Sequence, residues 1–506
     1  MSDPASIGAA ILRHAQSCPD SRAMVATGFE PLSYRDLRDY VTRTALRLRE
    51  SGLDHSARVA VALPSGADAA LTIVATACAA VAVPIDTQLT APEIDERLAS
   101  LRPRVVIVPA HGPSPTRDVA IGRGLAIVEA NRGAGGKLGV SFSFPEVGPA
   151  IAAEEPDAAA TAFILQTSGT TAKPKLIPFS HGNMLAAAAR VQSWFGLTSA
   201  DRCLGVSPIC YSHGLKVTVF TPLITGGSVA FPVSPSSLDV DEWLGTLRPT
   251  WYSAGPTLHR FMLDKTKLLP NAKSIHKLRF VVSGGAPLTR EVREGLSVSL
   301  GVPVVEHYGS SEAAQISANL PPPKGPFKPG TCGVPTKGVV KIVAESGREV
   351  APGEHGEILL AGPTLTSGYL EAPELNLISF VDGWFRTGDI GSLDADGFLT
   401  LHGRKTEVIN RGGEKISPAE IDDALQRHPD VAEAAAYAVP HPRLGEDVAA
   451  AVVLREGATV TPLKLREFLL PTLAQFKIPR RIVFVERLPK GATGKVQRQR
   501  LVEESK

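Results

Sequence analysis

The stretch that decides the fold is residues 165–175, LQTSGTTAKPK, which follows an apolar, strand-like run at residues 162–165. It carries four hydroxyl residues, one glycine and two lysines within eleven positions. Backbone amides freed by glycine, hydroxyl donors and ammonium groups are what a polyphosphate requires. The spacing is not the GxxxxGK[ST] of a P-loop. By itself the stretch fits a phosphate-gripping loop or a flexible surface loop equally well.

On both sides of residues 165–175, short β-branched runs alternate with longer Ala- and Leu-rich stretches. This alternation predicts an α/β fold with largely parallel sheets. Ser180 is suited to cap the helix that follows, where Met184, Ala188, Val191 and Phe195 recur at helical spacing. We expect strands at residues 58–63, 105–109, 163–167, 280–283 and 303–306, and helices at residues 34–50, 183–195 and 290–300.

The pattern of residue types along the chain changes after Gly330. Short strands separated by Gly and Asp turns predict a smaller β-rich subdomain at residues 331–403. From about Glu407 a compact α+β unit of about 100 residues follows. Its expected elements are a helix at 418–426, strands at 432–439 and 449–454, and a helix at 463–470.

Composition excludes several classes of protein. Among 506 residues, 53 Lys and Arg nearly balance 51 Asp and Glu, which argues against a nucleic-acid partner. Five scattered cysteines without a CxxC pair indicate neither a disulfide framework nor a zinc site. The longest apolar run, residues 69–83, is shorter than the roughly 20 residues of a membrane span and predicts a buried helix. The first residues lack the pattern of a signal peptide, so we expect a cytoplasmic protein without a membrane span.

Four further segments contain residues capable of chemistry. An apolar strand ends in Tyr308-Gly309-Ser310-Ser311-Glu312, where the ring suits a purine face and the carboxylate suits Mg²⁺. The other three are Thr387-Gly388-Asp389, residues 403–407 and the Gly-flanked residues 490–495, which end in Lys495. Taken singly, each also fits an ordinary turn, hinge or charged tail.

In this order along the chain, the five segments together resemble the adenylate-forming superfamily of acyl- and aryl-CoA synthetases, peptide-synthetase adenylation domains and beetle luciferases. The similarity extends from Leu32 to Leu501. Residues 410–418, NRGGEKISP, and 325–330, GPFKPG, are most similar to CoA ligases of small acids such as oxalate and malonate.

The resemblance implies an ATP site. The loop residues that would grip the β- and γ-phosphates are Thr167, Ser168, Gly169, Thr170, Thr171 and Lys175. Tyr308 would cover adenine, Ser311 would approach the α-phosphate, and Glu312 would help to bind Mg²⁺. The remaining ATP contacts would come from Gly284 and Gly285, which also line the acyl pocket, and from Asp389 and Arg404 at the ribose.

The resemblance also implies where the acid and CoA bind. Lys495 matches the lysine that bridges the substrate carboxylate and the α-phosphate. Gly412 and Gly413 would border the pantetheine tunnel. The acyl pocket would be lined by Tyr211, His213, Gly309 and Gln315, although His213 fits a structural role equally well.

The activity that the resemblance implies uses ATP, Mg²⁺, coenzyme A and a carboxylic acid. The acid attacks the α-phosphorus, pyrophosphate leaves, and CoA then displaces AMP from the acyl-adenylate. A mobile C-terminal lid, residues 407–506, would rotate about a hinge at residues 404–406 relative to the N-terminal domain, residues 1–403. The identity of the acid and the oligomeric state stay open.

Several positions depart from the family pattern. Ser311 stands where Thr is usual, Thr406 where a hinge Asp or Lys is usual, and Tyr211 where His is frequent. Gln315 replaces a histidine of the oxalate enzymes, and the bare Gly284 and Gly285 leave room for a larger acid. His259 and Arg260 could receive a second carboxylate, but a helix face is the preferred interpretation.

Two other functions remain as alternatives. An adenylating enzyme could load a carrier-protein thiol, although no Asp stands at the position near Tyr211 that would bind an amino group. A catalytically silent nucleotide-binding regulator is the other alternative, and the retained Lys495 argues against it.

Overall fold

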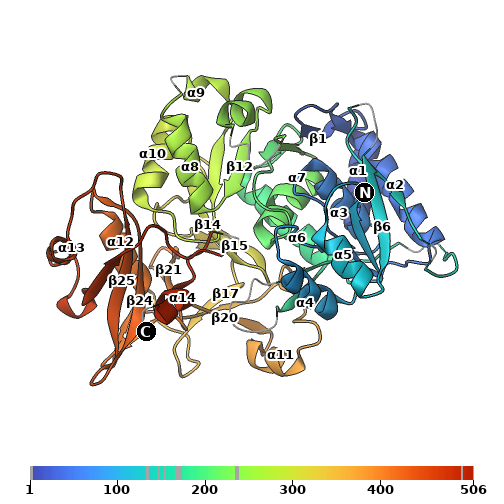
Figure 1. Ribbon diagram of the computed structural model, residues 1–506. Helices are drawn as coiled ribbons and strands as arrows, with labels where there is room; N and C mark the ends of the chain where they lie inside the picture. The colour runs from blue at the N-terminus through green and yellow to red at the C-terminus, as the bar shows by residue number, and fades with distance from the viewer. Residues whose placement is uncertain are drawn as a thin grey trace.

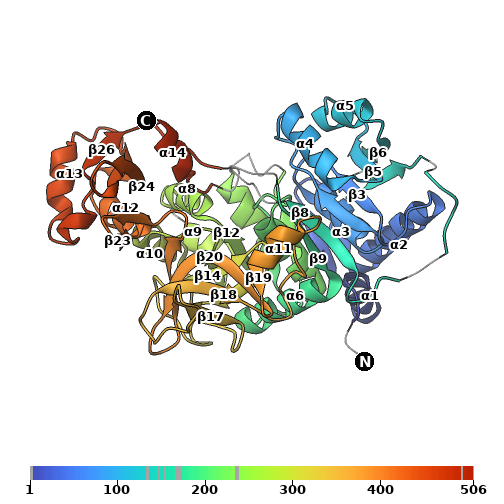
Figure 2. The same ribbon diagram turned by 90° about the horizontal axis from the view of Figure 1, so that it is seen from below.

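The computed structural model describes residues 4–132, 136–145, 147–152, 155–166, 174–233, 239–269, 271–491 and 494–504. The predicted phosphate-loop residues Thr167, Ser168, Gly169, Thr170 and Thr171 lie outside these ranges. The described chain forms two large sheets, a smaller β-rich sheet and a C-terminal α/β unit that lies to one side (Figures 1 and 2).

The first large sheet has the strand order β7-β6-β5-β3-β4-β8-β9. Its central pairs are parallel, and β7 and β9 pair antiparallel at the edges. The strands are β3 (Arg58–Val61), β4 (Val81–Pro84), β5 (Val105–Pro109), β6 (Ala126–Arg132), β7 (Val140–Ser143), β8 (Thr161–Gln166) and β9 (Leu176–Ser180).

The second large sheet has the order β16-β15-β14-β13-β12-β10-β11-β1-β2, and its parallel strands run from β1 to β14. Its strands are β1 (Arg22–Ala26), β2 (Leu32–Ser33), β10 (Arg202–Leu204), β11 (Ser228–Phe231), β12 (Trp251–Ala254), β13 (Phe280–Ser283), β14 (Val304–Ser310), β15 (Ala314–Ala318) and β16 (Val334–Pro335).

Two smaller antiparallel-rich sheets follow in the chain. The first contains β17 (Val340–Val343), β18 (Gly356–Leu360), β19 (Phe380–Val381), β20 (Trp384–Leu393) and β21 (Leu399–Arg404). The C-terminal sheet contains β22 (Ile409–Arg411), β23 (Glu414–Ile416), β24 (Val431–His441), β25 (Gly445–Leu454) and β26 (Arg481–Phe484).

Helices cover the sheets and close the core. Those of the N-terminal part are α1 (Ile7–Ser17), α2 (Tyr34–Glu50), α3 (Ala67–Ala77), α4 (Ala91–Leu101), α5 (Pro115–Gly122), α6 (His181–Phe195), the π-helix η1 (His213–Phe220), α7 (Thr221–Ile224), the π-helix η2 (Glu242–Thr246), α8 (Pro256–Thr266), α9 (Ala272–Ile275), α10 (Arg290–Leu300) and α11 (Pro373–Ser379). The C-terminal part adds α12 (Pro418–Gln426), α13 (Pro462–Leu469), the 3₁₀ turn η3 (Gln475–Lys477) and α14 (Arg498–Glu504).

The α/β interpretation of the sequence is confirmed, because the local signals agree with the packing. Ser33 caps α2 in a capping box with Asp36, and Ser180 does the same for α6 with Asn183. The apolar run at residues 69–83 is only partly the predicted helix, because α3 ends at Ala77 and β4 begins at Val81. Both pieces are buried, and an apolar run does not by itself distinguish a buried helix from a buried strand. Within the described ranges no helix is long and apolar enough to cross a membrane.

Among the contacts between the C-terminal unit and the N-terminal part, two lie on the side of α8 and α10. Arg455 forms an ion pair with Glu291 of α10, with 2.9 Å between Nη2 and Oε2. Gly494 approaches the first turn of α8 so closely that a Cβ there would lie 2.9 Å from Thr257 Oγ1. These contacts place the segment that carries Lys495 beside the strand ends of the second large sheet.

Candidate active site

The centre of the candidate site is the carboxylate of Asp389, which connects three strands. Tyr308, at the end of β14, donates its hydroxyl to Asp389 Oδ2 at 2.8 Å. Arg404, the last residue of β21, places Nε 3.0 Å from Asp389 Oδ1. The carboxylate raises the pKa of Arg404, and burial raises the pKa of the Tyr308 hydroxyl. Tyr308, Asp389 and Arg404, all predicted from the sequence to be ATP contacts, are therefore brought together.

A second group of contacts surrounds Glu312. The hydroxyl of Tyr369 donates to Glu312 Oε1 at 2.8 Å, and the ring of Tyr369 lies under Lys175, with Nζ 4.9 Å from the ring centroid. Among the described residues, no group of three His, Cys, Asp or Glu side chains is arranged to hold a metal. Mg²⁺ commonly takes one or two carboxylates together with substrate phosphates and water, so a single placed carboxylate fits an ion that arrives with a nucleotide.

A fully buried lysine lies behind Ser311. Lys216, in η1, donates from Nζ to the carbonyl oxygen of Ser311 at 2.7 Å. Its ammonium also lies over the ring of Phe179, 3.6 Å from the centroid. Burial lowers the pKa of Lys216 to about 7, against an opposing effect of Glu312. Lys216 thus ties η1 to the backbone of the motif that contains Ser311 and Glu312.

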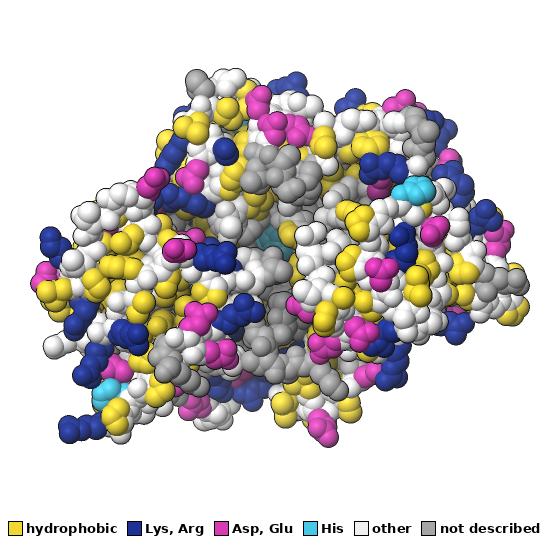
Figure 3. All heavy atoms as spheres, in the orientation of Figure 1, with side chains coloured by type: hydrophobic (Ala, Val, Ile, Leu, Met, Phe, Trp, Pro, Cys, Tyr) yellow, Lys and Arg dark blue, Asp and Glu magenta, His cyan; other side chains and the backbone are white. Residues whose placement is uncertain are grey.

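Lys495 reaches this centre from the C-terminal unit. Burial and the positive charge of Arg404 lower its pKa, and the carboxylates of Asp389, Glu407 and Glu312 oppose that shift. The same groups place Lys495 within electrostatic range of residues from β20, β21 and the Ser311–Glu312 segment. Figure 3 shows a hollow at the centre of this face, with a histidine side chain at its floor.

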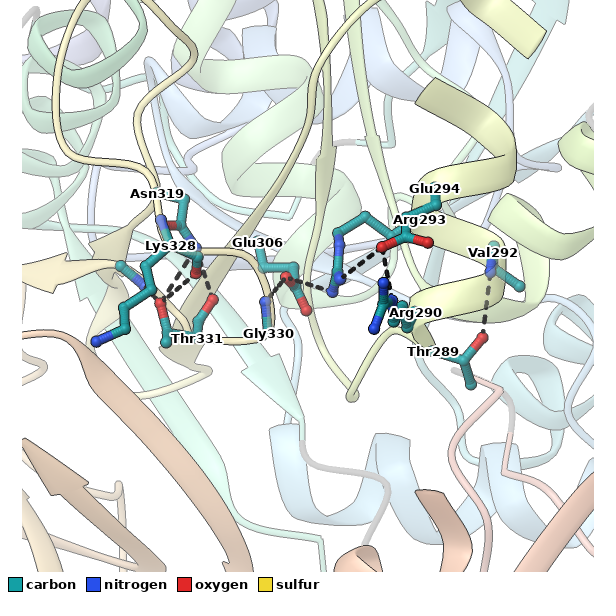
Figure 4. Close-up of polar contacts among 11 residues, drawn as sticks. Thr289, Arg290, Val292, Arg293, Glu294, Glu306, Asn319, Lys328, Gly330 and Thr331 are labelled. Atoms are coloured by element: carbon teal, nitrogen blue, oxygen red, sulfur yellow. Dashed lines mark hydrogen bonds and ion pairs between the residues drawn. The ribbon is translucent and has the colours of Figure 1, made fainter. Parts of the chain in front are cut away.

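Glu306, on the same strand as Tyr308, connects β14 to Gly330 and to Arg293 of α10 (Figure 4). Glu306 Oε2 accepts a hydrogen bond from the Gly330 amide at 3.0 Å and lies 3.5 Å from Arg293 Nη1. Burial raises the pKa of Glu306, while Gly330 and Arg293 oppose that shift. The segment GPFKPG is therefore held against β14, which gives a structural reason for its presence near the site.

Several residues predicted to line the acyl pocket lie around the start of η1. Tyr211 donates its hydroxyl to Asp86 Oδ2 at 2.7 Å, and the rings of His213 and His307 lie 5.4 Å apart. Gly284 is required for this packing, because a Cβ there would lie 2.0 Å from His307 Nε2. The expectation that Gly284 leaves room for a larger acid is thus wrong: the ring of His307 fills the space beside it. Gly285 does face open space, with no atom within 4 Å of an added Cβ.

Other predicted residues are placed as follows. Gly309 and Gln315 face each other across a bulge between β14 and β15, and a Cβ at Gly309 would meet the Ala314 carbonyl oxygen at 2.2 Å. Gln315 is buried. Gly412 and Gly413 form the turn between β22 and β23, both with positive φ, and the Gly412 amide bonds to the Leu444 carbonyl of the same unit. The structure thus places these two glycines in the C-terminal sheet rather than beside Tyr308.

The helix-face interpretation of His259 and Arg260 is confirmed. His259 is buried in α8, with its ring nitrogens bonded to the Tyr252 hydroxyl and the Ala254 carbonyl. Arg260 pairs with Asp264 and Glu291. Neither side chain is placed to receive a substrate carboxylate.

Four residues of the site were missed by the sequence reasoning: Lys216, Tyr369, Asp86 and His307. Lys216 had a usable signal, since a lysine inside the apolar stretch LKVTVF is unusual for a buried helix. Tyr369 and Asp86 carry no local signal, because their partners lie 57 and 125 positions away. His307 stands beside the predicted Tyr308, but only the packing against Gly284 singles it out.

Comparison with known proteins agrees with this geometry. Residues 11–370 match the family described as AMP-binding enzyme, and residues 420–495 match the AMP-binding enzyme C-terminal domain. The chain is 35% identical to oxalate–CoA ligase of Arabidopsis thaliana over 96% of both chains.

Two solved structures are similar over nearly the whole chain. ATP-bound MatB from Rhodopseudomonas palustris is 28% identical, with a TM-score of 0.86 and 99% of each chain covered. The o-succinylbenzoate CoA synthetase of Bacillus subtilis, in complex with its acyl-adenylate, is 26% identical, with a TM-score of 0.83 and 99% and 98% covered.

The chain belongs to the AMP-binding enzyme family. Within that family it is an ATP-dependent, AMP-forming acid–CoA ligase that acts through an acyl-adenylate. The predicted α/β architecture, with a large N-terminal part of several sheets and a small C-terminal part, is confirmed as well.

Replacing Lys216 tests its desolvated state through stability. The pKa of Lys216 is about 7 in the folded chain against an ordinary lysine value of 10.5, so between these pH values the unfolded chain binds a proton that the folded chain releases. The free energy of unfolding therefore gains a contribution that rises with pH through this window. We expect Lys216→Met to lose that rise in denaturant unfolding measured from pH 7 to 10, and the exposed-site variant Lys464→Met to keep it. Equal pH slopes in Lys216→Met and the parent chain would contradict the assignment.

Replacing Tyr369 tests the support of Glu312. Tyr369→Phe removes one hydrogen bond to a carboxylate, worth about 1.5–3 kcal/mol. We expect pyrophosphate release to fall at least about tenfold at low Mg²⁺, with a higher Mg²⁺ concentration needed for half-maximal rate. Tyr437→Phe, in the C-terminal unit, is the matched control. An unchanged Mg²⁺ dependence in Tyr369→Phe would remove Tyr369 from the site.

Proposed function

We propose that this protein is a CoA ligase of a short carboxylic acid, with Mg²⁺-ATP bound around Tyr308, Glu312, Asp389 and Arg404. The observation that carries the proposal is the position of Lys495, brought from the C-terminal unit to within electrostatic range of Glu312, Asp389 and Arg404. A cation at this position is needed because the substrate carboxylate and the α-phosphate, both anions, must approach each other.

In the proposed adenylation step, the substrate carboxylate attacks the α-phosphorus while Lys495 contacts both. The ammonium screens the repulsion between the two anions and stabilises the charge that develops on the phosphoryl oxygens. Tyr308 covers adenine, and Asp389, held by Tyr308 and Arg404, accepts from the ribose hydroxyls. Ser311 approaches the α-phosphate, and Glu312 would hold Mg²⁺, which supplies further charge neutralisation when bound.

The phosphate grip is assigned to Thr167, Ser168, Gly169, Thr170 and Thr171, together with Lys175. Lys175 is the described member of this group, and its place over Tyr369 puts a cation next to the Glu312 carboxylate. That proximity supports a triphosphate that extends from Ser311 toward Lys175.

The thioester step requires a different placement of the C-terminal unit in this proposal. In this arrangement Lys495 would lie beside the reacting carboxylate, whereas Gly412 and Gly413 form the β22–β23 turn of the C-terminal sheet. Rotation of residues 407–506 about a hinge at residues 404–406 would exchange the two loops. The turn after β21 supports that hinge, because Arg404 accepts a backbone hydrogen bond from Glu407 directly after the site.

The acid is short in this proposal. The His307 ring occupies the space beside Gly284, and His213 lies 5.4 Å from it, so the acyl pocket between η1 and the strand ends is reduced. Both imidazoles would have to move before a long or fused-ring acyl group could enter.

The function is tested by AMP formation with Mg²⁺-ATP across acids from acetate and oxalate to octanoate and coumarate, each with and without CoA. We expect CoA-dependent AMP formation to be confined to acids of about two to four carbons. AMP formation only with long or aromatic acids would contradict the short-acid proposal. Transfer to a carrier-protein thiol but not to CoA would contradict the ligase itself, as would ATP binding without pyrophosphate release.

The role of Lys495 is tested by separating the two half-reactions. Lys495→Ala should lower pyrophosphate release at least about 100-fold, the scale of losing one positioned electrostatic contact, yet largely spare thioester formation from supplied acyl-adenylate. Lys490→Ala is the matched control, because Lys490 lies in the same segment and pairs with Glu433 of the C-terminal unit. Equal losses in both half-reactions of Lys495→Ala would refute the assignment.

A further inference from the structure

Four buried polar atoms on η1, β12 and β14 have no protein partner among the described residues. These atoms are both ring nitrogens of His307, Nε2 of His213 and the hydroxyl of Ser253. His307 is 7% exposed and Ser253 is fully buried. Buried polar groups are nearly always hydrogen-bonded, and leaving one unpaired costs about 1–3 kcal/mol. Several such atoms in one place therefore indicate a missing ligand.

These three residues, His213, His307 and Ser253, lie together and are here named the histidine–serine cluster. Ser253 pairs with Val282 in the sheet, and Val282 pairs with Val305. The side chains of Ser253, Val282 and Val305 therefore lie on one face of the sheet. His307 follows Val305 by two residues and therefore points to that face as well. His213 lies over it from the start of η1, its ring 5.4 Å from that of His307.

The cluster is uncharged near neutral pH. Burial lowers the pKa of His213 to about 4 and that of His307 to about 3. The backbone of Ser253 opposes that shift at His213, and Nε2 of His213 has no partner among the described residues. A neutral His307 offers one donor and one acceptor, and Ser253 offers one hydroxyl.

We propose that the histidine–serine cluster binds a hydroxyl group on the acyl part of the substrate, so that the enzyme activates a short hydroxy acid. This inference rests on the proposed function, because it names the acid of the same site. A hydroxyl both donates and accepts, so it can bond an acceptor nitrogen of one imidazole and a donor of the other imidazole or of Ser253 at once.

Other acyl groups fit the cluster less well. A second carboxylate has only acceptors, so it leaves the acceptor nitrogen of a neutral His307 unpaired, and it brings a charge among groups that are uncharged near neutral pH. The buried cation in the same helix, Lys216, is already bonded to the Ser311 carbonyl. An alkyl group would leave every polar atom of the cluster unpaired, and sites built to bond a hydroxyl reject such analogues strongly.

The test compares glycolate, lactate and 3-hydroxypropionate with the acids that lack the hydroxyl (acetate and propionate) and with oxalate and malonate. The readout is kcat/KM for CoA-dependent AMP formation. We expect each hydroxy acid to exceed its unsubstituted partner and the dicarboxylates by at least about 100-fold. His307→Phe should reduce that preference below about tenfold.

Two further variants keep the test decisive. Ser253→Ala removes one hydroxyl without adding volume and should lower the hydroxy-acid preference even if His307→Phe fails to fold. His276→Phe is the matched control, because the ring nitrogens of this buried histidine are bonded to Leu300 and Leu278, and it should keep the preference.

The outcomes separate the two proposals. Equal or better use of dicarboxylates or unsubstituted acids, or an unchanged preference in both His307→Phe and Ser253→Ala, would overturn the inference and show that the cluster holds water. The short-acid ligase would then still stand. AMP formation with none of these acids would overturn both.

Discussion

The ion pair of Asp389 with Arg404, closed on its other side by the Tyr308 hydroxyl, is the interaction on which the site depends. It joins the end of β14, in a large parallel sheet, to β20 and β21 of the β-rich sheet. Because Arg404 is also the first residue of the predicted hinge, residues 404–406, the same pair lies where the chain leaves for the C-terminal unit. The approach of Lys495 follows from this, since its neighbours are the groups that the pair holds in place.

The charges around this pair are arranged to receive anions. Arg404 pairs with Asp389, Lys175 lies over the ring of Tyr369, and the carboxylates of Asp389 and Glu312 are each bonded to a tyrosine hydroxyl. A hydroxyl donor holds a carboxylate in position without cancelling its charge. These hydroxyls keep the carboxylates of Asp389 and Glu312 oriented beside the cations Arg404 and Lys175. In the proposed mechanism, that balance lets one centre bind a ribose, a metal–phosphate complex and a second acid.

Much of this could be predicted from the sequence, since the informative signals are local. Helix caps such as Ser33 and Ser180, and strand runs that end in glycine and hydroxyl residues, are contiguous in the chain, so the architecture could be predicted. The roles of Tyr308, Asp389, Arg404 and Lys495 rest on the resemblance of the ordered motifs to the adenylate-forming superfamily and stay predictions. Long-range partners could not: Tyr369 supports Glu312, and Asp86 binds Tyr211, across separations that leave no pattern in the sequence. The sequence predicts open space beside Gly284, because glycine has no side chain. The ring of His307, which comes from the neighbouring strand β14, fills that space and could not be foreseen from Gly284 itself.

In the proposed mechanism, the arrangement of the C-terminal unit in which Arg455 pairs with Glu291 makes the adenylate and excludes the thioester step. The most direct measurement joins the two units where Arg455 pairs with Glu291, using Glu291→Cys and Arg455→Cys in a Cys18→Ser background and a short bis-maleimide. We expect the linked protein to form one equivalent of acyl-adenylate and pyrophosphate but no acyl-CoA. The unlinked double variant should form acyl-adenylate and acyl-CoA. Acyl-CoA at the unlinked rate, or no adenylate from the linked protein, would contradict it.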